Sequence, residues 1–168
     1  MDKYEDKIIK LGVLYYLTSL FGYIYELIIT FTRTQKVFSH GFLNGPWLPI
    51  YGIGSLLIMC LYKYRKNPMK IFLGSFVLSG ILEYLSGFLL LKFFKKRLWD
   101  YTGWFLNIDG FICLASLLCF AFGGLLVIYV MYPIAKKIYE IINKKTLKII
   151  LSILTIIFLG DLIASLLK

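Results

Sequence analysis

Residues 75–110 read SFVLSGILEYLSGFLLLKFFKKRLWDYTGWFLNIDG, and this stretch decides how the rest of the chain is interpreted. Its first part is an apolar run with Glu83 as its one acidic residue. Small residues stand at four-residue intervals around that glutamate, at Ser75, Ser79 and Gly87. Because residues four apart share one helix face, we predict an apolar helix with one small, polar face. A carboxyl group in such a helix indicates a functional site.

The second part of the stretch is richer in polar and aromatic side chains than a plain connection between apolar segments needs. It contains Trp99, Asp100, Tyr101, Trp104, Asn107, Asp109 and Gly110. Tryptophan and tyrosine are common at membrane interfaces, but an acid gains nothing from anionic headgroups. We therefore predict that these loop residues and Glu83 belong to one ligand-binding site or pathway.

The composition of the whole chain is that of a polytopic membrane protein. Of its 168 residues 60% are hydrophobic, and the mean hydropathy is +0.79. Several apolar runs reach roughly 20 residues, the length that spans a bilayer. A net charge of +10 would indicate nucleic acid in a soluble domain. Here lysine and arginine lie in short links between apolar runs, where they face headgroups, so no nucleic-acid partner is expected.

We predict an all-α integral membrane bundle, a single transmembrane domain over residues 1–168 with about five transmembrane helices. The expected spans are residues 8–31, 50–62, 71–94, 108–132 and 147–167. Glycine and proline interrupt residues 38–49, which are expected to form a re-entrant loop. Residues 134–146 have the pattern of an amphipathic basic helix at the membrane interface.

Counting lysine and arginine predicts the orientation of a multi-pass protein in the cell membrane. The N-terminus and the second and fourth links carry twelve of these residues: Lys3, Lys7, Lys10, Lys63, Arg65, Lys66, Lys70, Lys136, Lys137, Lys144, Lys145 and Lys148. The opposite side carries the other seven. We expect a cytoplasmic N-terminus and an outside C-terminus, which puts the two polar aromatic loops on the outer face.

An internal repeat links the first and third expected spans. At an offset of 57 residues, one set of five residues falls on another: Thr18, Gly22, Glu26, Thr30 and Trp47 on Ser75, Ser79, Glu83, Gly87 and Trp104. The two copies have the same topology, so we predict a two-helix parallel repeat. The alternative is a chance alignment of apolar helices built from few residue types. The repeat adds Glu26, Asn44 and Trp47 to the predicted site.

Structural roles are the alternative for several of these polar residues. Glu26 could form an ion pair with Arg33, and Glu83 with Lys92. Asp161, near the end of the last span, could reach outward to the headgroups. His40 is the one histidine, and a lone loop histidine is more often a hydrogen-bonding residue than a catalytic base. The cysteines lie in apolar runs without metal-ligand spacing, and nucleotide-binding motifs are absent, so neither metal nor cofactor is expected.

Four segments carry a resemblance to a known family. They are GFLNGPWLPIYG at residues 41–52, Glu83 to Gly87, Trp99-Asp100-Tyr101, and Asn107 with Gly110. Together they resemble the bacterial membrane family named putative ABC-transporter type IV, over most of the chain from Gly22 to Pro133. The resemblance implies a permease component.

Three classes of function stay open, and a purely structural partner protein fits least, because it would not need two intramembrane glutamates. A transporter or permease component with a polar site at the outer face fits the repeat and the intramembrane acids. A membrane-embedded enzyme acting on a lipid or lipid-linked substrate fits the acids, tyrosine and tryptophan gathered at one face. Aromatic walls with acids suit a small cationic or amphiphilic ligand. Besides the lipid bilayer, a partner subunit or a second copy of the chain is the expected partner.

Overall fold

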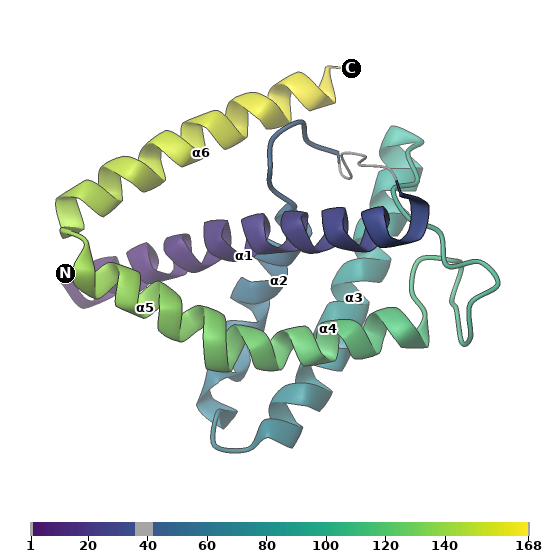
Figure 1. Cartoon of the computed structure of the whole chain (residues 1–168), viewed down its shortest axis with the longest axis horizontal. Coiled ribbons are helices and arrows are strands. Elements are labelled where there is room, and N and C mark those ends of the chain that lie inside the picture. The colour runs from purple at the N-terminus through teal and green to yellow at the C-terminus, as the bar shows by residue number, and fades with distance from the viewer. Residues whose placement is uncertain (1, 36–41, 168) are drawn as a thin grey trace. The chain divides into compact units, whose positions relative to one another are not determined.

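The computed structural model describes residues 2–35 and 42–167, and the regular structure in these ranges is helical (Figure 1). Four helical segments are long and apolar enough to cross a membrane: Lys3–Thr32, Pro68–Phe94, Leu114–Ile141 and Lys144–Leu166. The predicted all-α membrane bundle is therefore confirmed. Each of the four segments covers the greater part of a predicted span. The predicted start of the fourth span at residue 108 is wrong, because residues 108–113 belong to the loop and the helix begins at Leu114.

The region predicted as the second span, residues 50–62, has a different form. It consists of α2 (Pro49–Ile58), which continues as the tighter 3-10 helix η1 (Met59–Tyr64). The change of helix type and the shorter length set it apart from the other four. The described part of the predicted re-entrant loop, residues 42–48, is a run of bends that ends where α2 begins. Residues 38–41 of that loop lie outside the described residues.

The fourth span and the predicted interfacial helix form one helical run. α4 (Leu114–Leu126) passes through the π-helix η2 (Val127–Met131) into α5 (Tyr132–Ile141). We expected Pro133 to end the span. It lies instead in the first turn of α5, where proline is tolerated, and the wider π-turn before it accommodates a ring that would clash with a regular helix. The break falls ten residues later, where the Asn143 side chain caps α6 (Lys144–Leu166) by accepting the Lys145 N–H at 2.8 Å.

Two compact units make up the chain, and the first comprises residues 1–52 and 131–168. In it α5 packs along α1 (Asp2–Thr34), and the start of α1 lies beside the α5–α6 turn (Figure 1). Lys144 Nζ joins the carboxylates of Glu5 and Asp6 at 2.8 Å each. Farther along, the Tyr16 and Thr155 hydroxyls hydrogen bond at 2.8 Å. Polar contacts therefore fix α6 to α1 along its first half.

The second unit, residues 53–130, is built on α3 (Pro68–Phe94) packed against α4. Asn67 caps α3 and Pro68 occupies its first turn, while Lys95 ends it in a left-handed conformation with φ of 54°. The buried face of α3 consists of Ile71, Ser75, Ser79, Gly80, Glu83 and Gly87. A β-carbon at Gly124 of α4 would overlap the Ser75 side chain. The small, polar face predicted around Glu83 is therefore where α4 approaches closely, as small residues permit.

Candidate functional site

Glu83 is the most buried acid that the sequence singled out, with 3% of its surface exposed. Its carboxyl group accepts two hydrogen bonds from hydroxyl groups. Tyr101 Oη, in the loop after α3, lies 3.0 Å from Oε1, and Ser116 Oγ, in the first turn of α4, lies 2.9 Å from Oε2. Burying a carboxyl group without hydrogen-bond partners costs several kcal/mol. These two hydroxyls hold Glu83 between the loop and α4.

The start of α4 fixes Ser116 in place. Cys113 is the N-cap residue, and its Sγ accepts the Ser116 N–H at 3.4 Å. In return Ser116 Oγ accepts the Cys113 N–H at 3.1 Å, which completes a capping box. The one hydroxyl hydrogen of Ser116 has two acceptors within reach, Glu83 Oε2 at 2.9 Å and the Cys113 carbonyl oxygen at 3.0 Å. The local helix signal and the long-range contact thus use the same atom.

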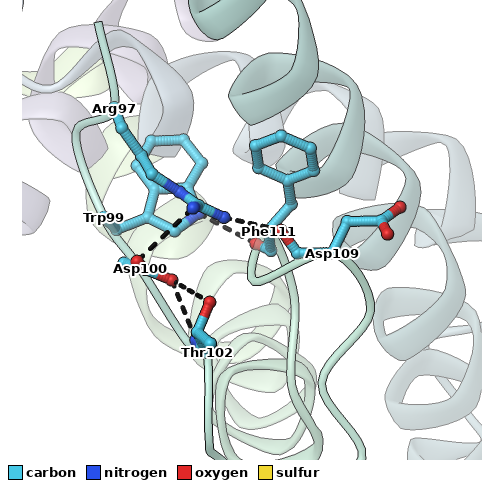
Figure 2. Close-up of polar contacts among 6 residues, drawn as sticks. All are labelled: Arg97, Trp99, Asp100, Thr102, Asp109 and Phe111. Atoms are coloured by element: carbon cyan, nitrogen blue, oxygen red, sulfur yellow. Dashed lines mark hydrogen bonds and ion pairs between the residues drawn. The ribbon is translucent and has the colours of Figure 1, made fainter.

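Polar contacts connect the two ends of the loop between α3 and α4 (Figure 2). The Arg97 guanidinium donates to the Asp109 carbonyl oxygen at 2.5 Å, lies 3.4 Å from the Asp100 carboxylate and stacks 5.2 Å above the Phe111 ring centroid. Trp99 Nε1 donates to the Phe111 carbonyl oxygen at 2.8 Å. Gly110 has a φ of 70°, and a β-carbon there would meet the Arg97, Asp100 and Thr102 side chains. Glycine is therefore required at this crossing of the loop.

Asp100 is turned into this network and not toward Glu83. One of its oxygens, Oδ1, accepts both the Thr102 hydroxyl at 2.6 Å and the Thr102 backbone N–H at 2.9 Å (Figure 2). The hydrogen bond from the Thr102 hydroxyl, followed by the backbone N–H and the nearby Arg97, holds the pKa of Asp100 below its usual range. Asp100 therefore shapes the loop that covers Glu83.

A second tyrosine–carboxylate pair ties the loop to α3. Tyr84 Oη donates to Asp109 Oδ2 at 2.7 Å. It reverses the first pair, because here the helix supplies the tyrosine and the loop supplies the acid. The Phe111 ring packs edge-on against the rings of Tyr84 and Phe88, at 5.5 and 6.5 Å between centroids. The loop is thus fastened over the Glu83 turn of α3 at two adjacent positions.

The remaining predicted residues of this loop lie nearer the surface. Trp104 packs edge-on against Tyr101 with 5.9 Å between ring centroids, and 43% of its surface is exposed. Asn107 is exposed, and its side-chain amide donates to the Trp104 carbonyl oxygen at 2.9 Å. Asn107 stabilises the loop, while Trp104 supports the tyrosine that reaches Glu83.

In the first unit, Glu26 has a tyrosine partner of its own. Tyr51 Oη, in the first turn of α2, donates to Glu26 Oε1 at 2.7 Å. A β-carbon at Gly22, one turn earlier on α1, would overlap the Tyr51 ring. The small residue of the repeat pattern therefore makes room for the ring that reaches the glutamate. Arg33, the alternative partner of Glu26, has a side chain outside the described part of the structure, as does the whole of His40.

Asn44 and Trp47 converge on Asp161 of α6. Asp161 Oδ1 accepts the Asn44 backbone N–H at 3.0 Å and the Asn44 side-chain amide at 2.8 Å. Its other oxygen, Oδ2, accepts the Gly45 N–H and the Trp47 indole N–H, each at 2.8 Å. Instead of reaching outward to headgroups, Asp161 holds residues 44–47 against α6.

The structure thus brings the predicted site residues together in two groups. The second unit contains Glu83, Trp99, Asp100, Tyr101, Trp104, Asn107 and Asp109. The first unit contains Glu26, Asn44 and Trp47. That both groups form one cavity stays a prediction. Sequence reasoning missed Tyr51, Tyr84, Ser116 and the role of Asp161. Of these, Ser116 and Asp161 carried a signal, since each is a polar residue in an apolar span. No three His, Cys, Asp or Glu side chains within residues 2–35 and 42–167 come close enough to hold a metal ion.

Comparison with protein families identifies a match over most of the chain. A family model described as "Putative ABC-transporter type IV" matches residues 13–166. Neither a curated protein nor a solved structure matches the chain.

Proposed function

This chain belongs to the family described as "Putative ABC-transporter type IV" and is a multi-pass membrane protein, and we propose that it is the permease component of a transport system. The observation that carries the proposal is the setting of Glu83. A carboxyl group in the middle of an apolar helix is expensive to bury, and such groups usually mark a substrate or ion pathway. The two hydroxyls that hydrogen bond to Glu83 come from two different elements, the loop and α4. This arrangement allows a ligand to replace one hydroxyl while the other stays bound.

The chemistry around Glu83 favours a small cationic or amphiphilic ligand. Glu83 supplies an acidic group, and the rings of Tyr101 and Trp104, packed edge-on at 5.9 Å, supply aromatic faces. Cations bind favourably over such faces, more strongly where water is excluded. Because Glu83 is 3% exposed in this structure, we propose that the Tyr101 hydrogen bond opens when ligand enters.

Binding of tetraphenylphosphonium, a lipophilic cation, to the purified protein tests this proposal. Glu83→Gln keeps the shape of the side chain, and we expect it to weaken binding at least tenfold, about 1.4 kcal/mol. The matched control is Glu140→Gln, which removes an exposed acid of α5 paired with Lys136 at 3.7 Å. It should bind like the parent. If Glu83→Gln folds and binds with the affinity of the parent, Glu83 is structural and the proposal is wrong.

A second measurement separates a permease from a membrane-embedded lipid enzyme. The tagged parent and the tagged Glu83→Gln variant are each purified from the membrane of a strain that expresses them. An ATPase subunit that co-purifies with the parent supports the permease. A change in the mass of membrane lipids that depends on the parent and is lost in Glu83→Gln supports the enzyme instead.

We propose the orientation predicted from the lysine and arginine count, with a cytoplasmic N-terminus. The structure makes one fusion point informative, because α2 and η1 are the weakest candidate for a span. A reporter after Lys66 is expected in the cytoplasm if that pair of helices crosses the membrane, and outside if it does not. A reporter after Lys168 is expected outside with five spans and in the cytoplasm with four. Lys66 outside with Lys168 in the cytoplasm, or both reporters on one side, would contradict the five-span arrangement.

A further inference from the structure

The turn at residues 44–47 presents four N–H groups to one carboxylate. Two come from Asn44, one from the Gly45 backbone and one from the Trp47 indole, and each oxygen of Asp161 receives two of them at 2.8 to 3.0 Å. Successive backbone N–H groups that converge in this way form an anion-binding nest. Two donors on each of two oxygens is the pattern that fits a planar carboxylate.

Contacts within the turn and to α1 hold its backbone, while the Trp47 ring also packs edge-on against Phe158 of α6 at 6.0 Å between centroids. The Trp47 backbone N–H donates to the Gly45 carbonyl oxygen at 2.9 Å, and the Leu48 N–H donates to the Ser19 carbonyl oxygen of α1 at 3.1 Å. Residue 45 must be small, because a β-carbon there would meet the Trp47 indole. The four N–H donors that face Asp161 therefore all belong to one short segment.

Beyond Phe158, whose ring packs edge-on against Tyr15 at 6.0 Å between centroids, the last two turns of α6 bury little apolar surface within the chain. Leu159, Ile163 and Leu166 are 48%, 58% and 46% exposed, whereas Ser165, which accepts the Asn44 amide at 2.9 Å, is 3% exposed. Gly160 stands directly before Asp161, and a β-carbon there would meet nothing within 4 Å. Glycine inside a helix costs about 1 kcal/mol relative to alanine, and packing does not require it here. The end of α6 is thus attached mainly through polar contacts and follows a weak point in the helix.

We propose that the 44–47 turn is a carboxylate-binding site that Asp161 fills in this structure, and that a carboxylate-bearing ligand exchanges with Asp161 and releases the end of α6. The inference uses the first unit alone and is independent of the role proposed for Glu83. Lipid phosphodiesters also present two oxygens, so the experiment distinguishes them from carboxylates.

The Trp47 indole N–H reports directly on the site. The chain has three tryptophans, so ¹⁵N-tryptophan labelling gives three indole resonances, and Trp47→Phe assigns the one that matters. In Asp161→Ala we expect this resonance to move toward the position of a weaker hydrogen bond. Sodium acetate should return it saturably, with half-saturation on the order of 1–100 mM. In the parent, acetate should move the same resonance only at a higher concentration, because the tethered Asp161 carboxylate competes at high effective concentration. A parent that does not respond even at molar acetate, compared with sodium chloride at equal concentration, would overturn the exchange.

Controls make each outcome decisive. Glu140→Ala removes an acid elsewhere and should leave the Trp47 resonance unmoved by acetate. If Asp161→Ala does not fold, Asp161→Asn keeps the side-chain volume, and acetate should then displace the neutral amide at higher concentration. If acetate shifts the Trp47 resonance of a folded variant no more than sodium chloride does at equal concentration, the turn only holds α6 in place and the proposal is wrong. The third outcome is a shift of the Trp47 resonance of Asp161→Ala in phosphatidylglycerol nanodiscs, with no shift in phosphatidylcholine nanodiscs and none on adding acetate. This result would assign the site to phosphodiesters and overturn the carboxylate assignment.

Discussion

Glu26 and Glu83 occupy the same place in a repeated sequence pattern, yet their surroundings differ. Both accept a hydrogen bond from a tyrosine hydroxyl, at 2.7 Å from Tyr51 and at 3.0 Å from Tyr101. Glu26 is half-buried, and its tyrosine stands at the start of a helix. Glu83 is 3% exposed, and its tyrosine belongs to a folded loop.

The difference between the two glutamates lies in what packs opposite each helix. Glu83 faces the capped start of α4, whose Ser116 adds a second hydroxyl. The tryptophans of the repeat differ as well, because Trp47 donates to Asp161 whereas Trp104 packs on Tyr101. A repeated pattern therefore specifies a helix face, and the neighbouring elements decide which residue of the pattern becomes a site.

Removing each glutamate in turn is the strongest test of this difference. Glu83→Ala removes the carboxyl acceptor shared by the buried Ser116 hydroxyl and the half-buried Tyr101 hydroxyl. It also opens a cavity, so we expect the free energy of unfolding to fall by about 2–5 kcal/mol. Glu26→Ala should cost about 0.5–1.5 kcal/mol, since water can reach its partner. Denaturation of both variants in the same detergent measures the difference. Equal losses would mean that the burial of Glu83 has no energetic consequence.

The two tyrosines give a smaller and more specific comparison. Tyr101→Phe removes one donor from a buried carboxyl group, and about 1–3 kcal/mol of stability should be lost. Tyr51→Phe acts on a half-buried glutamate and should cost about 0.5–1 kcal/mol. Thermal melting of the two variants is the measurement. If Tyr51→Phe proves the more damaging, the contact in the first unit is the more important one.

The smallest effect concerns the loop that gives Glu83 its extra burial. Hydrogen bonds from Thr102 hold the pKa of Asp100 below its usual value. A folded-state pKa that is lowered contributes stability above the unfolded value near 3.9, and this contribution is lost as pH falls through the folded value. The loop should be insensitive to pH from 7 to about 5 and loosen below about pH 4.

An NMR titration of the Asp100 carboxyl group checks this directly. Thr102→Val removes the hydroxyl donor and should raise the pKa toward the usual value. An unchanged pKa in that variant would show that the Thr102 hydroxyl is not its main cause.

Much of the helical plan could be predicted from local pattern alone. The span predicted at residues 71–94 is α3, because Asn67 and Pro68 start a helix and a long apolar run continues it. The connection after Pro133 could not be predicted, since a π-turn that accommodates a proline leaves no periodic signal in the sequence. The helix type at residues 59–64 could not be predicted either, because 3-10 and α-helices share most of their residue preferences.

The candidate site shows where sequence reasoning ends. Four-residue spacing placed Glu83 on the small face of its helix, and α3 buries that face. The two hydroxyl partners of Glu83 are 18 and 33 residues away in the chain, and the donors of the 44–47 turn are 114 to 117 residues away from Asp161. Such pairs depend on how elements pack, which periodicity does not encode. Asp161 was therefore expected to reach headgroups, as a lone acid near a helix end usually does.

The two polar attachments of α6 also set a length. Lys144, which joins the acids of α1, and Asp161, which joins the 44–47 turn, are seventeen residues apart. At about 1.5 Å per residue they are separated by about 26 Å along the helix, close to the roughly 30 Å hydrocarbon thickness of a bilayer. Both attachments can then sit at the membrane boundaries only within a narrow range of bilayer thickness. A thicker bilayer would draw one of them into hydrocarbon. Lipid chain length should therefore affect how strongly Asp161 is held by the 44–47 turn.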